Sequence, residues 1–338
     1  MAQNTILSVV IPTYNRCKLV QLTLENLFSQ SLALDKYEVI IIDDGSEDGT
    51  YEMLSAKEQC IKNLRAYLQK HKYSGAARNL GIAHARGQII LSMDDDIVAD
   101  RFMLEEHLKY HAKYPSEYVA VRGKVITGIG AVDLCTPNGT RLGVVGQTPH
   151  GDKVLSVNSF VTNNVSWKRD WGIACGSFTP GLDRLDDRDL GMRMQAKGLQ
   201  LLYAPDAIGI HLGPMDTVEK VVISGKRYGR CLGDSYDQLP WVKYGLAHLG
   251  ARLNGGWTQL RGHPFAYLKD AIRRWTINRL TIGLLHRAAA AIPIKNPPSR
   301  VLVRLCKEIW AYYYREGFVR RRREVAKLNS NRLGTSQQ

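Results

Sequence analysis

Three features that often classify a protein are missing from this 338-residue sequence. It has no Cys-x-x-Cys pair, and its six cysteines are scattered over positions 17, 60, 135, 175, 231 and 306. This spacing argues against a disulfide framework or a zinc site and is typical of reduced thiols. The amino-terminal residues lack the basic start and apolar core of a secretory signal, and the longest apolar stretch, 276–294, is interrupted by Arg279, His286 and Arg287. We therefore expect a cytoplasmic protein without a spanning helix.

Acidic residues are scarce in the last third of the chain. Residues 217–338 contain 23 Lys and Arg but only 7 Asp and Glu, whereas residues 1–216 contain 23 and 25 and are nearly neutral. The net charge of +14 therefore belongs to the carboxyl-terminal part. We predict two parts, residues 1–216 and a basic helical region at 217–328, followed by a polar, disordered tail at 329–338.

The basic region also contains tryptophan and tyrosine, notably Trp310 and the run 312–314. Cationic and interfacial aromatic residues together favour attachment to an anionic membrane surface, which would put the protein on the inner face of the cell membrane. A helical packing domain with a solvated basic face and a homo-oligomer interface are the alternatives. Nucleic acid is a poorer candidate partner, because no reader motif accompanies the charge.

Apolar, β-branched runs alternate with helical patterns in the first part of the chain. Strands are predicted at 6–11, 37–42, 64–68 and 87–93, with helices at 19–29, 50–61 and 76–85. The alternation predicts the α/β class, with a mixed, mostly parallel sheet flanked by helices. Further along, the patterns predict a helix at 103–114, short β-like pieces at 118–165, a helix at 190–197, a strand at 199–203 that ends before Pro205, and helices at 218–232, 267–291 and 301–319.

The strand predicted at 87–93 ends in three adjacent aspartates, Asp94, Asp95 and Asp96. Clustered carboxylates repel one another and are costly to fold unless a cation balances them. A divalent cation with oxygen ligands is one explanation. A solvated turn or a helix N-cap is the other, since aspartate suits both, and the triplet alone does not decide between them.

Polar segments follow the four predicted strands, at residues 12–16, 43–50, 74–81 and 94–96. In a parallel sheet the carboxyl ends of the strands meet at one edge, where open α/β sheets bind ligands. Together with the segments 183–193 and 204–213, they resemble the A-type (GT-A) fold of family 2 inverting glycosyltransferases. The resemblance covers about residues 6–213. It implies transfer of a sugar from a nucleotide-sugar donor, usually a UDP-sugar, to a hydroxyl acceptor.

The resemblance implies roles for the residues that bind the nucleotide. Four residues look like the family's nucleotide loop: Pro12, Thr13, Tyr14 and Asn15. The Tyr14 ring would stack on the base, and its alternative is an ordinary loop aromatic. Asp44 matches the acidic residue that reads the uracil edge, because a carboxylate can accept a hydrogen bond from an imide N–H. Arg78 matches a basic residue beside the base or diphosphate, with a surface helix residue as the alternative.

The acidic triplet resembles the family's Asp-x-Asp signature, whose carboxylates share one Mn²⁺ or Mg²⁺ with the donor diphosphate. Asp94 and Asp96 have this spacing, and Asp94 with Asp95 fits a register shifted by one. The resemblance favours Asp96 for the metal and Asp94 for the ribose or the metal. His211 occupies the position of a histidine that often completes the metal site, and a structural role is its alternative.

Asp187 lies where the family has its catalytic base. Such a base removes the proton from the acceptor hydroxyl as its oxygen attacks the anomeric carbon. An acidic helix start is the other interpretation of this segment, in which Asp186 stands where glutamate is usual. The resemblance also implies four residues around the sugar and acceptor pocket: Asn163, Asn164, Trp167 and Asp186. A buried core residue is the alternative for Trp167.

The sequence therefore predicts a metal-dependent inverting glycosyltransferase of cell-surface polysaccharide or glycolipid synthesis, with a saccharide or lipid-linked acceptor. A sugar nucleotidyltransferase is one alternative, but the glycine-rich N-terminal loop of such enzymes is absent around residues 12–16. A non-catalytic nucleotide- or membrane-binding protein is another. The intact carboxylates Asp94, Asp96 and Asp187 argue against it.

Overall fold

The computed structural model describes residues 5–127, 142–213, 217–235, 280–293 and 300–334, together with positions 239, 277 and 278. Contacts divide the chain into two compact units. The first unit contains the residues up to 129 together with 138–213, and the second contains 130–137 and 214–338. Each unit is described by itself.

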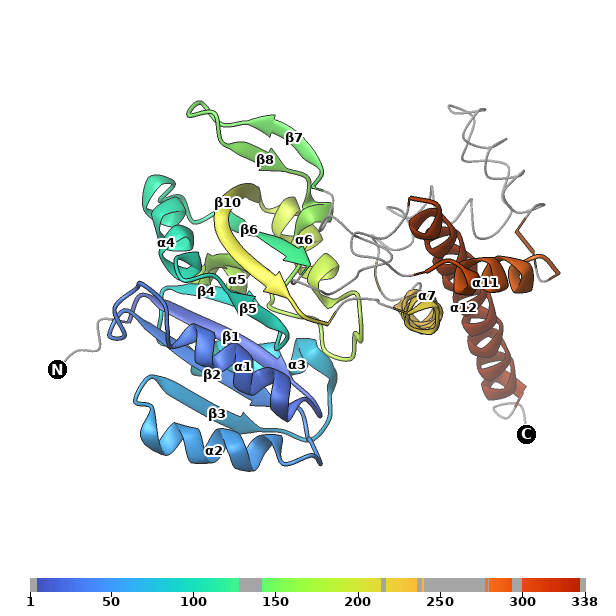
Figure 1. Cartoon of the computed structure of the whole chain (residues 1–338), viewed down its shortest axis with the longest axis horizontal. Helices are drawn as coiled ribbons and strands as arrows, with labels where there is room; N and C mark the ends of the chain where they lie inside the picture. Colours follow the sequence, from blue (N-terminus) through green and yellow to red (C-terminus); the bar gives the residue numbers. More distant parts are fainter. Residues whose placement is uncertain are drawn as a thin grey trace. The chain divides into compact units, whose positions relative to one another are not determined.

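The first unit is built on one mixed sheet (Figure 1). Its strands are β1 (Leu7–Thr13), β2 (Tyr37–Asp43), β3 (Leu64–Leu68), β4 (Ile89–Met93), β5 (Ile97–Ala99), β6 (Val119–Thr127), β7 (Val144–Gln147), β8 (Lys153–Leu155), β9 (Asn164–Lys168) and β10 (Gln200–His211). Their order is β3-β2-β1-β4-β9-β6-β10-β8-β7, and β5 pairs with β10. Strands β1 to β4 are mutually parallel, as are β6 and β10, whereas β9 runs antiparallel between these two groups.

Helices cover both faces of this sheet. They are α1 (Cys17–Leu27), α2 (Thr50–Cys60), α3 (Tyr73–His84), α4 (Met103–Lys113), α5 (Arg169–Ala174) and α6 (Asp186–Ala196), with a single 3₁₀ turn at Val157–Ser159. Side chains alternate across β1, so Val9 packs with α1, α2 and α4 on one face, whereas Val10 packs with α3, α5 and α6 on the other. Burial on both faces explains why β1 and β2 read as continuous apolar runs. The predicted α/β class is confirmed.

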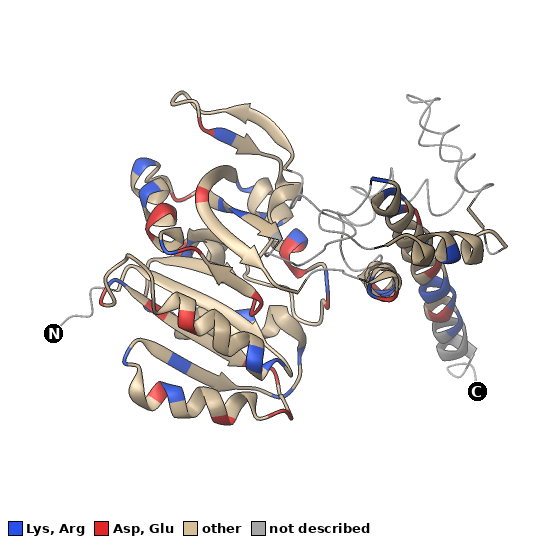
Figure 2. Ribbon diagram, in the orientation of Figure 1, with Lys and Arg blue, Asp and Glu red and all other residues tan. Residues whose placement is uncertain are grey.

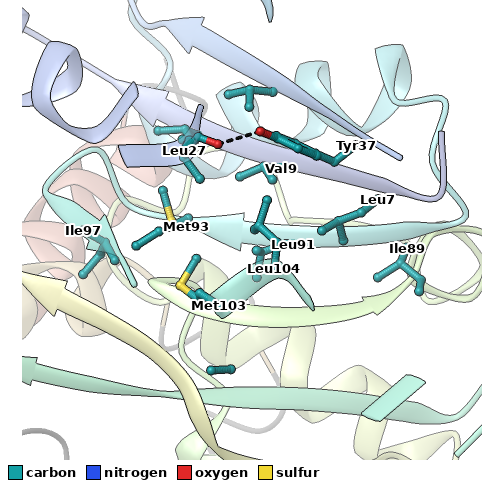
Figure 3. Close-up of a cluster of buried hydrophobic side chains, with 14 of the residues drawn as sticks. Leu7, Val9, Leu27, Tyr37, Ile89, Leu91, Met93, Ile97, Met103 and Leu104 are labelled. Carbon is teal, nitrogen blue, oxygen red and sulfur yellow. Dashed lines mark hydrogen bonds between the residues drawn. The ribbon is translucent and has the colours of Figure 1, made fainter. Parts of the chain in front are cut away.

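Figure 3 shows the core on the α1 side of the sheet, where Leu7 and Val9 meet Leu91 and Leu104. The one polar atom of Tyr37 is satisfied there, because its hydroxyl donates to the backbone oxygen of Leu27 at 2.7 Å. This bond fixes the end of α1 against the start of β2.

Two boundaries differ from the prediction. β10 does not end before Pro205 but continues to His211. The pairing of β10 with β6 shifts register between Ala204 and Ile208, so Pro205 lies in a bulge where its missing N–H breaks no regular ladder. Helix α6 begins at Asp186 and not at Leu190, because three aspartates in its first turn favour a helix start.

The described part of the second unit is helical, with α7 (Val218–Ser235), α11 (Ile282–Ala291) and α12 (Arg300–Gly334). The predicted helix at 267–291 is therefore seen only over its last part, because residues 267–276 lie outside the described residues. Without a proline to stop it, α12 extends to Gly334 and into the segment predicted to be a disordered tail. Within the described segments, no helix has the length and apolar character that a membrane span needs.

Glycines allow α7 and α12 to approach closely. A Cβ added at Gly225 would lie 2.7 Å from the backbone oxygen of Trp310, and one at Gly229 would lie 2.0 Å from that of Tyr314. On α12, a Cβ at Gly317 would lie 2.6 Å from the backbone oxygen of Lys226. The glycines recur every four residues along α7, at 225, 229 and 233, so they form one stripe facing α12.

Replacing Gly229 with alanine should destabilise the second unit, because the added methyl group meets backbone that cannot rotate away. We expect a loss of about 1–3 kcal/mol in the free energy of unfolding, measured by urea denaturation. Gly283→Ala in α11 is the matched control, since nothing lies within 4 Å of its added Cβ. A loss in Gly229→Ala no larger than in Gly283→Ala would contradict the close packing of the two helices.

Candidate active site

The candidate site lies at the carboxyl edge of the parallel strands. β1 and β2 pair in register through Thr13 with Asp43, and β4 runs parallel beside β1. Parallel pairing brings the three strand ends to one edge. The loop after Thr13, the loop after Asp43 and the triplet that follows Met93 therefore share this edge.

The triplet is buried except at its first residue. Asp95 and Asp96 are 5% and 4% exposed. The Asp95 carboxylate accepts hydrogen bonds from Thr13 Oγ1 at 2.8 Å and from Arg16 Nη1 at 2.9 Å, and Nη1 also donates to Asp96 Oδ2 at 2.7 Å. Burial and the Asp96 charge raise the pKa of Asp95 to about 6, against the opposing effect of Arg16. A solvated turn would leave its carboxylates exposed to water, so this interpretation does not fit Asp95 and Asp96.

Backbone pairing brings His211 to the triplet. β5 begins at Ile97, directly after the triplet, and pairs antiparallel with the end of β10, so that Ile97 lies opposite His211. His211 Nε2 lies 3.4 Å from Asp96 Oδ1. The chain then passes so close that a Cβ at Gly213 would lie 2.3 Å from Asp96 Oδ2. A side chain at position 213 would therefore displace the Asp96 carboxylate from this position.

Asp96 and His211 fit a divalent cation. Asp96 Oδ1 is buried and accepts no hydrogen bond of ordinary geometry from the described residues, and its ion-pair partner is His211 Nε2 at 3.4 Å, so a cation could bind this oxygen. A carboxylate oxygen and an imidazole nitrogen together suit Mn²⁺. Across the described ranges, however, no three His, Cys, Asp or Glu side chains are grouped as a metal site, and Asp94 turns to Arg78 instead. A cation at Asp96 would need further oxygen ligands, such as water or a diphosphate.

Arg78 connects the triplet to helix α6. It is only 4% exposed, so it is not a surface helix residue. Its Nη2 donates to Asp94 Oδ1 at 2.7 Å, and its Nη1 donates to Asp186 Oδ2 at 2.9 Å. Its Nε donates to Ser92 Oγ at 3.0 Å. The guanidinium is thus engaged with protein partners, and a direct contact with a base or diphosphate requires one of these bonds to open.

The two aspartates that begin α6 have different surroundings. Asp186 is 4% exposed and accepts from Arg78 and from Ser74 Oγ at 3.2 Å, so its carboxylate holds Arg78, and its role in an acceptor pocket stays a prediction. Asp187 is half-buried and accepts from the backbone N–H of Arg188 at 2.6 Å. Burial, reinforced by the adjacent Asp186 charge, raises the pKa of Asp187 to about 7. A carboxylate with this pKa can take up a proton near neutral pH.

The predicted base-binding residues lie after β1 and β2. Asp44 is buried, and its Oδ1 accepts from Gln69 Nε2 at 2.6 Å and from the backbone N–H of Lys72 at 2.8 Å. His71 Nδ1 lies 2.9 Å from Asp44 Oδ2. The same His71 ring lies 4.4 Å, between centroids, from Tyr14, which is 43% exposed. An exposed aromatic ring beside a fixed carboxylate suits a planar, hydrogen-bonding ligand.

The other two residues of the predicted nucleotide loop are structural. Pro12 is part of β1 and pairs with Ile42. Asn15 has a φ of 52°, a conformation that asparagine tolerates better than most residues. Its N–H donates to Ser46 Oγ, and its Oδ1 accepts from the N–H of Glu47, both at 2.8 Å. Asn15 thus joins the loops after β1 and β2.

Two of the predicted pocket residues, Asn164 and Trp167, are buried inside the first unit. Asn164 is fully buried, donates to the backbone oxygen of Ala207 at 3.0 Å, and shares a hydrogen bond of 2.8 Å with His107 Nε2. Trp167 is fully buried against Phe160 and Phe178. Both are buried on opposite faces of β9, which favours the alternative stated for Trp167, a buried core residue, over contact with a sugar. Asn163 is half-buried, and its Oδ1 has no partner in the described structure.

Two cations near the triplet were not singled out from the sequence. Arg16 contacts Asp95 and Asp96 as described. Arg122 on β6 is 1% exposed and donates to the backbone oxygen of Asn164 at 2.8 Å. Burial lowers its pKa to about 10, while the charges of Asp94 and Asp187 act in the opposite direction. An arginine directly after the apolar run 119–121 was the available signal, because strands buried on both faces rarely contain one.

The sheet, the aspartates at its carboxyl edge and the carboxylate at the start of α6 are features of the GT-A class of proteins. The model of Glycosyl transferase family 2 matches residues 8–180, about half of the chain, and the chain belongs to this family. Membership of this family favours glycosyl transfer over the nucleotidyltransferase and the non-catalytic alternatives.

Curated relatives agree with this family. The chain is 29% identical over 209 residues to the glycosyltransferase AglE of Haloferax volcanii, and 24% identical over 251 residues to the uncharacterized glycosyltransferase YfnE of Bacillus subtilis. Each match covers 60% of this chain, and 66% and 64% of the relatives, respectively. The chain thus spans slightly less than two thirds of their length.

Solved structures share the fold. A mannosyltransferase of Pyrobaculum calidifontis in complex with GDP-mannose and Mn²⁺ has a TM-score of 0.59 at 18% identity, covering 93% of this chain and 86% of its own. Residues 1–349 of Staphylococcus aureus TarS with UDP-GlcNAc have a TM-score of 0.52 at 15% identity, covering 95% and 92%. The GT-A architecture predicted from the sequence is confirmed.

Proposed function

We propose that this glycosyltransferase moves a sugar from a nucleotide sugar, a UDP-sugar in particular, to a hydroxyl group with inversion of the anomeric carbon and with a divalent cation. The observation that carries the proposal is the chain of ion pairs Asp94–Arg78–Asp186. It ties the acidic triplet to the helix start that bears Asp187. The GDP-mannose and UDP-GlcNAc in the solved neighbours support a nucleotide-sugar donor.

In this proposal the residues at the two ends of the network have different chemical roles. A divalent cation held by Asp96 and His211 would stabilise negative charge on the departing diphosphate. Asp187 accepts the proton of the acceptor hydroxyl, so that the oxygen attacks the anomeric carbon from the face opposite the diphosphate. Tyr14 and Asp44 bind the base. The acceptor is a saccharide or a lipid-linked saccharide of cell-surface polysaccharide or glycolipid synthesis.

A panel of UDP- and GDP-sugars, each with Mn²⁺, with Mg²⁺ and with EDTA, tests the proposal. We expect release of nucleoside diphosphate from one donor, at a rate that falls at least about 100-fold in EDTA. Asp96→Asn should lose the metal response. Release that is equally fast with and without metal would refute metal dependence, and no release from any donor would refute the donor class.

We also propose that the second unit attaches the enzyme to the inner face of the cell membrane. Leu280 and Leu284 are 88% and 64% exposed beside Arg287, and Lys and Arg recur along α12 (Figure 2). Exposed leucines next to cations suit an anionic lipid surface.

The full chain should therefore float with vesicles of anionic phospholipid and not with neutral ones. Leu280→Glu together with Leu284→Glu should abolish flotation, whereas Leu34→Glu, at a leucine of the first unit that is 57% exposed, should not. If the wild-type chain does not float with anionic vesicles, the proposed membrane attachment is rejected. The homo-oligomer alternative would be supported if the wild-type chain sediments as an oligomer and the double Leu→Glu variant, but not Leu34→Glu, disrupts that oligomer.

A further inference from the structure

Arg16 occupies the place between two carboxylates of the triplet. One nitrogen, Nη1, lies 2.9 Å from Asp95 Oδ1 and 2.7 Å from Asp96 Oδ2. The carboxylates are 7% and 6% exposed, whereas the Arg16 side chain is 43% exposed. The cation therefore reaches in from the surface, while the anions belong to the interior.

The Asp95 carboxylate and the backbone of both aspartates are held independently of Arg16. Thr13 Oγ1 donates to the Asp95 side chain at 2.8 Å, and Thr23 Oγ1 donates to the Asp95 backbone oxygen at 2.8 Å. The Asp96 backbone oxygen accepts from the N–H of Leu212 at 2.8 Å. Arg16 itself stands at the start of α1, where its side chain makes no capping bond. The guanidinium is the component of this ion pair that can move.

A divalent cation and the Arg16 guanidinium would compete for Asp96. Both would be bound to the one carboxylate, and like charges a few ångströms apart in a buried site repel strongly. Arg16 also engages Asp95, the neighbour whose charge would otherwise attract the metal. Arg16 bound to Asp96 Oδ2 therefore opposes a cation at Oδ1, and the metal binds more readily once Arg16 withdraws.

We propose that Arg16 is the internal counter-ion of Asp95 and Asp96 in the donor-free enzyme, and that the divalent cation displaces it. The inference rests on the proposed metal-dependent function. The released guanidinium is then free to donate two hydrogen bonds to a phosphate group, a geometry that suits arginine. Arg16 is thus a positioning residue that makes metal and nucleotide bind together and keeps the metal weakly bound when no donor is present.

Calorimetric titration of the full chain with Mn²⁺, without nucleotide and with saturating UDP or GDP, tests this role. In the wild type, the nucleotide should strengthen Mn²⁺ binding. In Arg16→Gln, Mn²⁺ should bind at least about tenfold more tightly without nucleotide, because the competing charge is gone, and the nucleotide should strengthen it less. Lys18→Gln is the matched control, since Lys18 is exposed and forms no ion pair among the described contacts.

Arg16→Lys provides a second variant that keeps the charge and carries the test if Arg16→Gln does not fold. The ammonium of lysine is more strongly hydrated than a guanidinium, so it should compete less well for the two carboxylates, and Mn²⁺ affinity without nucleotide should lie above that of the wild type. Mn²⁺ affinity that is unchanged or weaker in both variants would overturn the inference. Failure of every variant and of the wild type to bind Mn²⁺ would instead reject the metal-dependent function itself.

Discussion

Replacing Asp187 with asparagine should lower kcat about 10²–10⁴-fold, the contribution expected of a general base. The asparagine keeps the size of the side chain and can accept the hydrogen bond that Arg188 N–H donates, but it cannot take up the acceptor proton. Donor binding should be unchanged, because the base site at Asp44 and the triplet are not altered. The measurements are initial rates of sugar transfer and the affinity for UDP in the same protein preparation.

The protonation state of Asp187 determines in which direction the rate should change with pH. A general base works in its charged form, so kcat/KM of the wild type should rise tenfold per pH unit below the Asp187 pKa of about 7 and level off above it. The residual activity of Asp187→Asn should lack this rise. Asp170→Asn removes an exposed aspartate and should behave as the wild type. Full activity in Asp187→Asn would refute the assignment of the base.

The sequence predicted the first half of the fold well, because its strands are apolar on both faces. β3 was predicted to the residue, and β1 and β2 differ from prediction by one or two residues at their ends. Each run is bounded by a turn, a proline or an acidic residue, so periodicity alone locates it. The carboxyl-edge location of the triplet then follows from parallel pairing.

The contacts inside the site could not be predicted in this way. The resemblance implied that Asp96 and His211 share one site, but periodicity could not, because their proximity depends on the pairing of β5 with β10 and a strand of three residues leaves almost no sequence signal. Asn164 and Trp167 were assigned to a pocket from a motif, but strand alternation on β9 puts both of them into the core. Sequence motifs located the ends of the strands, whereas strand pairing and side-chain direction determine which residues contact one another.

Arg78→Met should reduce the free energy of unfolding by about 3–5 kcal/mol, because removing one partner of a buried ion pair leaves the other charge uncompensated. Most of this loss comes from Asp186, whose carboxylate is 6% exposed, since the Asp94 side chain is 38% exposed and screened by water. Urea denaturation measures the change. Arg101→Met, at an exposed arginine of the same unit, is the matched control and should change little.

Combining Arg78→Met with Asp186→Asn distinguishes a charge effect from a packing effect. If the uncompensated Asp186 charge causes the loss, the double variant should be more stable than Arg78→Met alone, because asparagine is neutral and can still accept from Ser74. Loss of packing against the Phe178 ring would instead persist in both variants. Transfer activity should stay low in the double variant even where stability returns, since Asp94 and the start of α6 are then no longer joined. Recovered stability together with recovered activity would show that the ion-pair chain is not required to position Asp187.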